Sequence, residues 1–355
     1  ALECYERALE LAPVDLDTHE KLAQIHQKMG QFSEAEDAFK AVLTAAPDRV
    51  HLYHDLGDIY LAWHRWPDAL IAYQHVAEHH FEDPALYVGI GHASTALGKH
   101  QDGLSAFQRA IELAPENAEA YVGLGNIHTR ASRFEEAREM YETAIAHDPT
   151  KAAAHAGLGD VHRAQGDLEA SIEAYQQASQ LDDAFAPAHA GLGQAYAGTG
   201  RLFEALAAYQ RALDRDPNDA RSYLGLGHVY LHQNRTQAAA RVFQRAHEIE
   251  SGWPAPFVGL GHVYREQRRL EEALAAYRQA ISLAPQDPTP RIYLGDLYLE
   301  HGQVDDAHAA YREALELQSD LALAHYGVGR VFQAQNQPIP AFAAFRRALE
   351  LDGSL

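Results

Sequence analysis

Histidine is the residue type in this chain that most strongly suggests a chemical role. The sequence holds 22 histidines, and ten of them lie between His19 and His100. His75 and His79 are one helical turn apart, and His80 stands beside them, a spacing that can hold a metal ion. The simpler interpretation is that these rings lie on the outer face of a helix. We therefore predict no metal site, and metal binding within region 19–100 stays open as the alternative.

Pairs of glycines are a second feature that could do chemistry. Gly123 and Gly125 form a Gly-x-Gly pair, as a phosphate-binding fingerprint would require. That fingerprint also needs a third glycine three residues on, at the end of a strand and the start of a helix. The third position here is His128, and the pair lies inside an expected helix. No Walker loop, nucleophile elbow or His-Glu-x-x-His motif is present either. The sequence predicts a chain that is not an enzyme and uses no cofactor.

Composition excludes several classes of partner and structure. Fifty acidic residues against 29 basic ones give a formal charge of −21, which argues against nucleic acid or an anionic membrane surface as the main partner. The single cysteine, Cys4, rules out an internal disulfide framework and a cysteine-based zinc site. No run of 18 apolar residues occurs, so we predict no insertion into a membrane. Nothing in the sequence indicates a compartment.

A repeat of 34 residues organises the chain. Glycines occur at this period at Gly57, Gly91, Gly125, Gly159, Gly193, Gly227, Gly261, Gly295 and Gly329. Aromatic residues follow the same period at Tyr5, Phe39, Tyr73, Phe107, Tyr141, Tyr175, Tyr209, Phe243, Tyr277, Tyr311 and Phe345. The chain therefore consists of a 15-residue opening piece and ten blocks of 34 residues that fill positions 16–355. We number the positions within each block from 1 to 34.

Each block is predicted to form two helices. In block 118–151, Tyr121, Leu124 and His128 recur at helical spacing, and Ala137 and Tyr141 continue such a stripe in the second half. Between the halves, glycine occurs in five blocks and asparagine in two, as the left-handed end of a helix favours. The pattern predicts twenty-one helices, two for each block and one for the opening piece, and no strand.

These features resemble the tetratricopeptide repeat over the whole chain. The matching residues of one block are Tyr121, Leu124, Gly125, His128, Ala137, Tyr141, Ala144 and Pro149. The resemblance implies an all-α fold, an α-solenoid in which helix-turn-helix pairs stack into a right-handed superhelix with a concave groove. We expect residues 1–355 to form a single solenoid, with a half repeat at 1–15 and ten full repeats at 16–355.

The resemblance also implies which residues line the groove, mainly block positions 2, 5, 9, 12 and 13 of the first helix. Position 9 is polar in all ten blocks, which indicates a row that faces either a ligand or solvent. As peptide-binding residues we predict His92, Asn126, Asp160, Gln194, His228, His262 and Asp296. Replacing Asn126 and Gln194 by alanine should then weaken peptide binding at a stability cost within about 0.5 kcal/mol.

Position 5 is apolar from the third full block onward, and from it we assign Val122, Leu224 and Val258 to the same predicted site. Position 6 beside it is glycine in seven blocks, although glycine inside a helix costs about 0.5–1 kcal/mol relative to alanine. Something must approach closely at these glycines, either the adjacent helix or the backbone of a ligand. We favour the adjacent helix.

Charge and side-chain type narrow the class of ligand. The groove positions hold eight acidic and six basic residues, a mixture that suits an extended peptide better than a polyanion. The asparagine ladder of O-linked N-acetylglucosamine transferases needs asparagine at position 6, where this chain has glycine. The carboxylate clamp that grips chaperone tails needs lysine at position 5 next to Asn126, where this chain has Val122. Both specific chemistries are disfavoured.

Three functions are compatible with these patterns. Our first hypothesis is a non-catalytic scaffold that holds a protein or an extended peptide in its groove. The second is the recruiting arm of an enzyme or of a polysaccharide-secretion machine, with the chemistry outside these residues. The third is a structural protein that self-associates into fibres. The full-length gene would separate the second from the first, and light scattering against concentration would separate the third.

The two ends of the chain lead to a further expectation. Leu2, Tyr5, Leu9 and Leu11 form an apolar stripe that would normally pack on a preceding helix. Ile339, Phe342, Phe345 and Leu349 form a similar stripe in the last block. Because solenoids need polar terminal caps, we expect the chain to be an interior segment of a longer solenoid.

Overall fold

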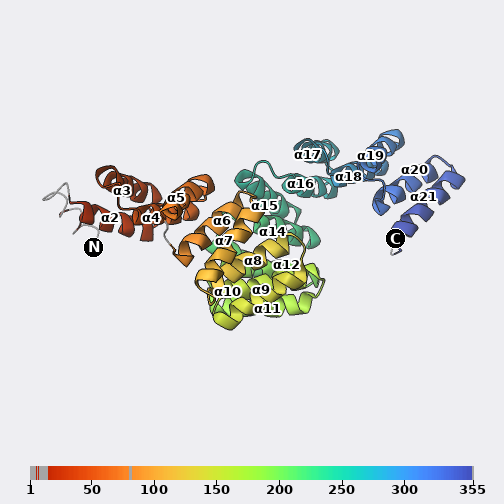
Figure 1. Ribbon diagram of the computed structural model, residues 1–355. Helices are drawn as coiled ribbons and strands as arrows, with labels where there is room; N and C mark the ends of the chain where they lie inside the picture. The colour runs from red at the N-terminus through yellow and green to blue at the C-terminus, as the bar shows by residue number, and fades with distance from the viewer. Residues whose placement is uncertain (1–4, 6, 8–14, 80–81, 354–355) are drawn as a thin grey trace. The chain divides into compact units, whose positions relative to one another are not determined.

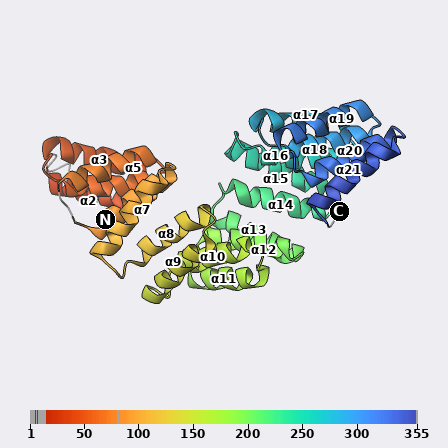
Figure 2. The ribbon, with the colours of Figure 1, turned by 45° about the vertical axis from the view of Figure 1, so that its right-hand side comes forward.

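The computed structural model describes residues 5, 7, 15–79 and 82–353, and Figures 1 and 2 show its ribbon from two directions. The helix and the apolar stripe predicted for the first 15 residues fall almost entirely outside the described residues. The chain divides into two compact units, unit 1 over Ala1–Asp182 and unit 2 over Asp183–Leu355. A single continuous solenoid over 1–355 stays a prediction.

Twenty helices and no strand occupy the described part of the chain, which confirms the predicted all-α solenoid. In unit 1 they are α2 (Leu16–Lys28), α3 (Phe32–Ala45), α4 (His51–Ala62), α5 (Trp66–Glu78), α6 (Pro84–Ala96), α7 (His100–Leu113), α8 (Ala118–Arg130), α9 (Phe134–His147), α10 (Ala152–Ala164) and α11 (Leu168–Leu181). In unit 2 they are α12 (Ala186–Gly198), α13 (Leu202–Arg215), α14 (Ala220–His232), α15 (Thr236–Ile249), α16 (Ala255–Glu266), α17 (Leu270–Leu283), α18 (Thr289–Glu300), α19 (Val304–Leu317), α20 (Ala322–Ala334) and α21 (Pro338–Leu351). Among these helices, none combines the length and the apolar character that crossing a membrane requires.

The helices form antiparallel pairs that stack on one another within each unit. We call the even-numbered helix of each pair the A helix and the odd-numbered one the B helix. Within a unit, a B helix packs on its own A helix and on the next one, as α5 packs on α4 and α6, and α15 on α14 and α16. Consecutive A helices also touch, for example α4 with α6 and α6 with α8. Because neighbouring repeats approach most closely along the A helices, these line the inner, concave side of each unit.

The turn inside each pair holds one residue in the left-handed region. Its φ lies between 57° and 84° in all ten blocks. Glycine or asparagine occupies seven of these positions, as predicted, and His64, Ser132 and Arg268 occupy the others. A left-handed conformation strains these three residues because they have a Cβ atom, whereas glycine would adopt it without that strain. Backbone hydrogen bonds close the turn around them, such as the one from Arg133 N to His128 O at 2.9 Å.

Aromatic rings at block position 24 are the largest side chains of the core, and six of them lie between two glycines. Tyr141 is 1% exposed and lies between Gly125 at position 8 of its own repeat and Gly157 at position 6 of the next. A Cβ atom added to Gly125 or Gly157 would lie 2.5 or 2.3 Å from atoms of that ring. The same arrangement recurs for Tyr73, Phe107, Tyr209, Phe243 and Tyr311 with glycines at positions 6 and 8. The position 6 glycines therefore serve the packing of adjacent repeats, as the sequence favoured.

Candidate functional site

A cavity of about 620 Å³ opens on the concave side of unit 1. Three consecutive A helices, α4, α6 and α8, provide most of its walls. Its lining residues are Asp58, Leu61, Ala62, Trp66, His92, Thr95, Ala96, Phe107, Gly123, Asn126 and Arg130. Asp58, His92 and Asn126 all occupy block position 9. The structure thus brings together two of the predicted site residues, His92 and Asn126, at one cavity.

The cavity joins an apolar wall to a few polar groups. Phe107, 1% exposed, lies at its inner side, and the His92 ring meets it edge-on with centroids 5.1 Å apart. Leu61 and Ala96 extend the apolar surface. Arg130 is exposed and makes no hydrogen bond or ion pair with the described residues. A ligand at this cavity would meet an apolar surface beside a cation that forms no ion pair with the described residues.

A carboxylate holds His92 in place from the neighbouring A helix. Nε2 of His92 lies 3.1 Å from Oε1 of Glu119, and Lys151 pairs with the other oxygen of the Glu119 carboxylate. The hydrogen bond from His92 and the charge of Lys151 lower the pKa of Glu119 to about 2 despite the opposing effect of burial. Glu119 is therefore ionised at neutral pH and fixes the orientation of the imidazole.

The polar row at position 9 has a structural role that our sequence analysis did not foresee. In five of the repeats whose position 24 is tyrosine, the hydroxyl of the buried ring reaches the position 9 side chain of the same repeat. These bonds join Tyr73 to Asp58 at 2.6 Å, Tyr141 to Asn126 at 2.8 Å, Tyr175 to Asp160 at 2.7 Å, Tyr277 to His262 at 2.9 Å and Tyr311 to Asp296 at 2.7 Å. Burial raises the pKa of Tyr141 to about 12 and shifts the other four upward, so all five remain donors.

The sequence carries a signal for this arrangement. Each tyrosine at position 24 has an Asp, Asn, Gln or His 15 residues earlier, which can accept its hydrogen bond. In two repeats with phenylalanine at position 24, a histidine ring instead meets it edge-on, as His92 does with Phe107 and His228 with Phe243 at 5.3 Å. In the repeats with tyrosine at position 24, the polar side chain at position 9 therefore bonds to a buried hydroxyl and does not serve only to contact a ligand.

This arrangement changes the expected cost of altering Asn126. Replacing it by alanine would remove an acceptor from the buried Tyr141 hydroxyl, and we expect unfolding free energy to fall by about 1–2 kcal/mol rather than within 0.5. Thr129, 3.2 Å from the same hydroxyl, keeps the loss moderate. Urea denaturation of Asn126→Ala, Tyr141→Phe and the double variant measures the coupling. If the two single effects simply add, the hydrogen bond contributes nothing.

The other predicted residues in unit 1 are Asp160 and Val122. Asp160 lies on the concave side, whereas Val122 is too deeply buried to contact a ligand. Asp160 accepts hydrogen bonds from Tyr175 and from Arg163, the latter at 3.1 Å. Val122 is only 3% exposed and belongs to a hydrophobic cluster with Tyr141. The apolar residue at position 5 therefore packs mainly against its neighbours.

In unit 2 the predicted residues follow the same pattern. Asp296 accepts from Tyr311 and also from Arg330 at 2.9 Å. His262 bonds to Tyr277 and lies edge-on to Tyr293 with centroids 4.6 Å apart, and burial lowers its pKa to about 4. Gln194 is half-buried and His228 exposed. Leu224 and Val258 are half-buried and pack against core clusters.

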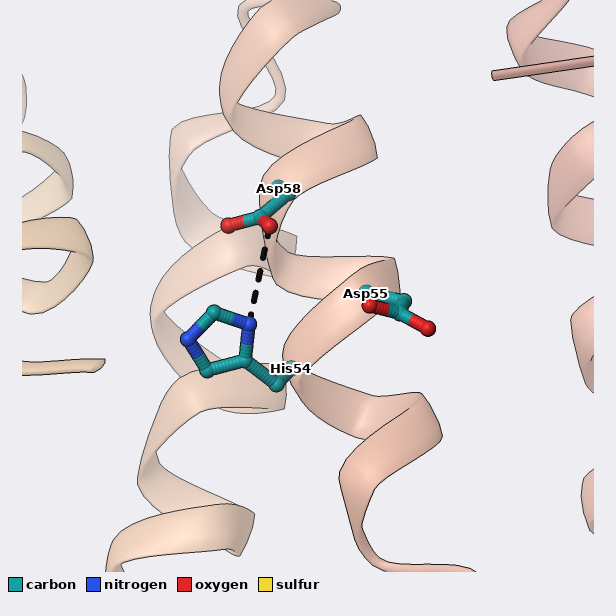
Figure 3. Close-up of side chains that lie close together, drawn as sticks. All are labelled: His54, Asp55 and Asp58. Carbon is teal, nitrogen blue, oxygen red and sulfur yellow. Dashed lines mark ion pairs between the residues drawn. The ribbon is translucent and has the colours of Figure 1, made fainter. Parts of the chain in front are cut away.

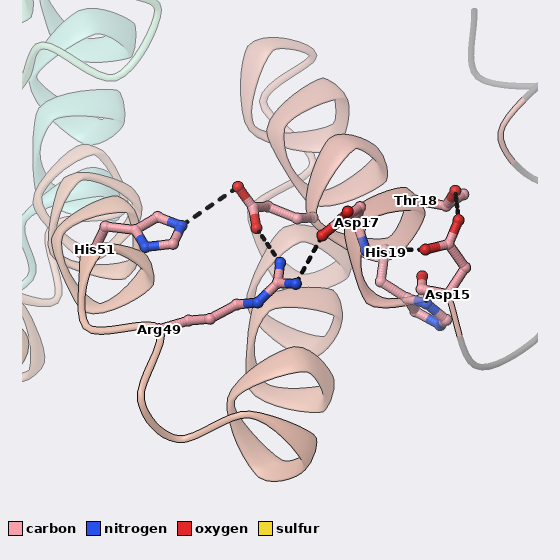
Figure 4. Close-up of polar contacts among 7 residues, drawn as sticks. Asp15, Asp17, Thr18, His19, Arg49 and His51 are labelled. Atoms are coloured by element: carbon pink, nitrogen blue, oxygen red, sulfur yellow. Dashed lines mark hydrogen bonds and ion pairs between the residues drawn. The ribbon is translucent and has the colours of Figure 1, made fainter.

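Most charges at the groove positions are matched by neighbours. Figure 4 shows the contacts between the first two repeats, where Arg49 bonds to Asp17 at 2.7 Å and to Glu20 at 2.8 Å, while His51 approaches Glu20 at 3.4 Å. In unit 2, Arg265 and Glu300 form a two-point ion pair on α16 and α18. The contacts of His51 and Arg265 join consecutive A helices, and Arg49 joins the turn before α4 to α2, so the free charge at the concave side is smaller than the residue counts suggest.

One cluster in unit 1 has the residue types of a cation site. His54, Asp55 and Asp58 on α4 place potential ligand atoms within 4.8 Å of one another. Figure 3 shows the His54 ring facing Asp58, with Nδ1 and Oδ2 3.5 Å apart, while Asp55 is turned to the other side. The ion pair raises the pKa of His54, and Asp58 also accepts from Tyr73. A helical ion pair accounts for this geometry.

The two histidines that the sequence singled out have structural contacts. His75 stacks on Tyr53 with ring centroids 4.0 Å apart, and His79 directs Nδ1 to the His75 carbonyl at 2.9 Å. The two rings lie 5.0 Å apart on α5, a B helix. His79 is exposed, as expected from the sequence, whereas His75 is half-buried against Tyr53 of α4. His80 lies outside the described residues.

Comparison with known proteins agrees with the repeat architecture. Tetratricopeptide-repeat family models match residues 20–83, 94–161, 129–173 and 190–254, and a TPR-repeat model matches 159–200, 261–302 and 295–336. Comparison with curated proteins gave no match. The crystal structure of the APC/C hetero-tetramer Cut9-Hcn1 is similar in fold at a TM-score of 0.60 and 15% identity, with 100% of this chain and 90% of that chain covered.

A second solved structure is similar over part of the chain. A tetratricopeptide repeat protein from Parabacteroides merdae ATCC 43184 gives a TM-score of 0.56 at 19% identity, with 66% of this chain and 93% of that chain covered. Proteins built from these repeats bind protein partners and are typically non-catalytic scaffolds. The family models, the unbroken 34-residue period and the stacked helix pairs together show that the chain belongs to the tetratricopeptide-repeat family and is, in general terms, a protein-interaction scaffold.

Proposed function

We propose that the concave side of unit 1 binds an extended segment of a protein partner, anchored at the cavity between α4, α6 and α8. The observation that carries this proposal is the cavity itself, where apolar walls adjoin an arginine that has no ion pair among the described residues. Its volume of about 620 Å³ suits a few side chains of a peptide, within the range of ligand pockets in proteins. Its walls come from three consecutive repeats, so a segment lying along them would contact each repeat in turn.

The chemistry of the lining indicates what the segment carries. Asp58 is already engaged by Tyr73 and His54, and His92 by Glu119. Within the part of the chain that the structure describes, Arg130 has no such partner, so it is the group that gains most from an incoming charge. We therefore propose a segment with an apolar side chain that enters beside Phe107 and a carboxylate that reaches Arg130. The amide of Asn126 would add a hydrogen bond while it keeps its bond to Tyr141.

The remaining predicted residues belong to the proposal as contacts along the same side of their own units. They are Asp160 and Val122 in unit 1, and Gln194, His228, His262, Asp296, Leu224 and Val258 in unit 2. Several of them are committed to tyrosine hydroxyls or to packing, so we expect each to contribute less than the residues of the cavity. Position 9 side chains could contact a ligand with the atoms that the tyrosines leave free.

A peptide selection tests the proposal. Peptides are selected from a displayed random library on the full chain, and their Kd values are measured for the wild type and for Arg130→Glu. We expect a loss of at least tenfold, because the variant replaces an attractive charge by a repulsive one.

Arg109→Glu is the matched control for that charge change. Arg109 lies on α7, a B helix of the same unit, and pairs with Glu82 and Glu112. The control should change the Kd by less than twofold. Selected peptides that ignore Arg130→Glu and depend on Arg109 would contradict the proposal and place binding on the outer side.

A further inference from the structure

A second cavity, of about 470 Å³, lies on the outer side of unit 2 where α15 meets the end of α16 and the start of α17. Its lining residues are Thr236, Gln237, Ala240, Arg241, Gln244, Tyr264, Gln267 and Arg269. Seven of these eight side chains can donate a hydrogen bond, and none is a carboxylate. A cavity lined almost wholly by donors is suited to a ligand rich in acceptors.

The charge around this cavity is opposite to that of the whole chain. Residues 235–269 contain six arginines and three glutamates, in a chain whose formal charge is −21. The first turn of α15 holds no acidic residue, whereas those of α13, α17 and α19 each hold at least one. Arg245, Arg265 and Arg269 form ion pairs with glutamates, so the positive charge that is not paired within the described residues rests on Arg235, Arg241 and Arg268.

The donors of the cavity divide into a positioned group and a free group. Arg269 lies over the Tyr264 ring at 4.7 Å and bonds to Glu272 Oε1 at 2.8 and 3.0 Å and to Gln267 at 3.2 Å. In contrast, the side chains of Arg241, Thr236, Gln237 and Gln244 make no hydrogen bond or ion pair with any described residue. Arg241 is thus an unpaired, exposed guanidinium beside three uncommitted donors.

From these observations we propose that the cavity binds a phosphoryl group carried on a side chain of a protein partner. A phosphoryl group brings close to two negative charges and three strong acceptor oxygens, and a guanidinium can bind it through two parallel hydrogen bonds. A single carboxylate would leave most of the uncommitted donors without an acceptor. The cavity is also larger than one phosphate ion, which leaves room for the residue that bears the group. The site belongs to unit 2 and shares no residue with the cavity of unit 1, so it stands independently of the function proposed above.

The test uses the full chain and a fluorescent peptide library with phosphoserine at a fixed centre and degenerate flanks, together with the same library carrying serine. We expect the phosphoserine library to bind at least tenfold more tightly, and the difference to shrink as salt is raised. Arg241→Glu should lower binding at least tenfold, and Arg241→Gln, which keeps donors but removes the charge, should lower it by an intermediate factor. Circular dichroism confirms that each variant keeps its helix content.

Two further arms decide between this site and simpler explanations. Arg312→Glu on α19 makes the same change of net charge in unit 2, at an exposed residue paired with Glu316, and should alter binding less than twofold. Inorganic phosphate should compete only at concentrations at least tenfold higher than the phosphopeptide. The proposal is overturned by equal losses in the two charge-reversed variants, by equal binding of the serine library, or by inorganic phosphate that competes as well as the peptide.

Discussion

Replacing Gly157 by alanine is expected to lower the unfolding free energy of unit 1 by about 2 kcal/mol or more. In an ordinary helix the same change would stabilise by about 0.5–1 kcal/mol, so the predicted sign is reversed. The new Cβ would lie 2.3 Å from the ring of Tyr141, and Gly125 confines that ring on the other side. The ring is 1% exposed and has no free space into which it could move.

The measurement must be local, because long repeat arrays do not always unfold as one cooperative step. Hydrogen exchange of α8, α9 and α10, together with the urea midpoint, reports the loss where the clash occurs. Gly252→Ala serves as the control, since nothing lies within 4 Å of its added Cβ. In a Tyr141→Leu background, the cost of Gly157→Ala should fall below half. A cost that is unchanged in that background would mean that the ring is not the cause.

The repeat architecture was predictable because it rests on spacing. A residue type that recurs every 34 positions indicates that the same environment occurs in every repeat. Chance cannot produce so many matches, so Gly125, Tyr141 and their equivalents can be recognised as structural positions. The helix pairs and their left-handed turns follow from that spacing. His64, Ser132 and Arg268 escaped prediction at the turns, because backbone hydrogen bonds impose the conformation there and the side chain does not reveal it.

The candidate site was predictable only in part, because a pattern shared by all repeats does not show which repeats form a cavity. Position 9 is polar in every block, so the pattern could not indicate that one cavity forms beside Asp58, His92 and Asn126. That cavity depends on small residues, Ala62 and Ala96, at block position 13 and on the exact stacking of three repeats. The bond from Tyr141 to Asn126 joins residues on two helices, and single-helix patterns do not report it. Val122 looked available for a ligand because burial between neighbouring repeats is invisible in one block.

Acidification is expected to destabilise unit 2 through His262. Burial lowers the pKa of this histidine from 6.5 to about 4, with His228 and Arg265 acting in the same direction. Between these two pKa values the unfolded chain binds a proton that the folded chain excludes, so stability is fully present above pH 6.5 and falls as the pH decreases. From pH 7.5 to pH 5 the loss through this one group is about 2 kcal/mol.

The variant His262→Asn isolates that effect, because the chain already uses asparagine for the same task. Asn126 accepts the hydroxyl of Tyr141 at the equivalent place, so asparagine at 262 should keep the bond to Tyr277 while it removes the titrating ring. Thermal unfolding at pH 7.5, 6, 5 and 4.5 should show a steeper decline for the wild type than for the variant. His228 is exposed, but its neighbours partly desolvate it and so lower its pKa, and both proteins share this contribution. Parallel pH profiles for the two proteins would show that His262 becomes protonated in the folded state at its ordinary pKa and is not protected by burial. Hydrogen exchange of α16 and α17 then distinguishes a loss centred on this histidine from a general acid effect on the many carboxylates of the chain.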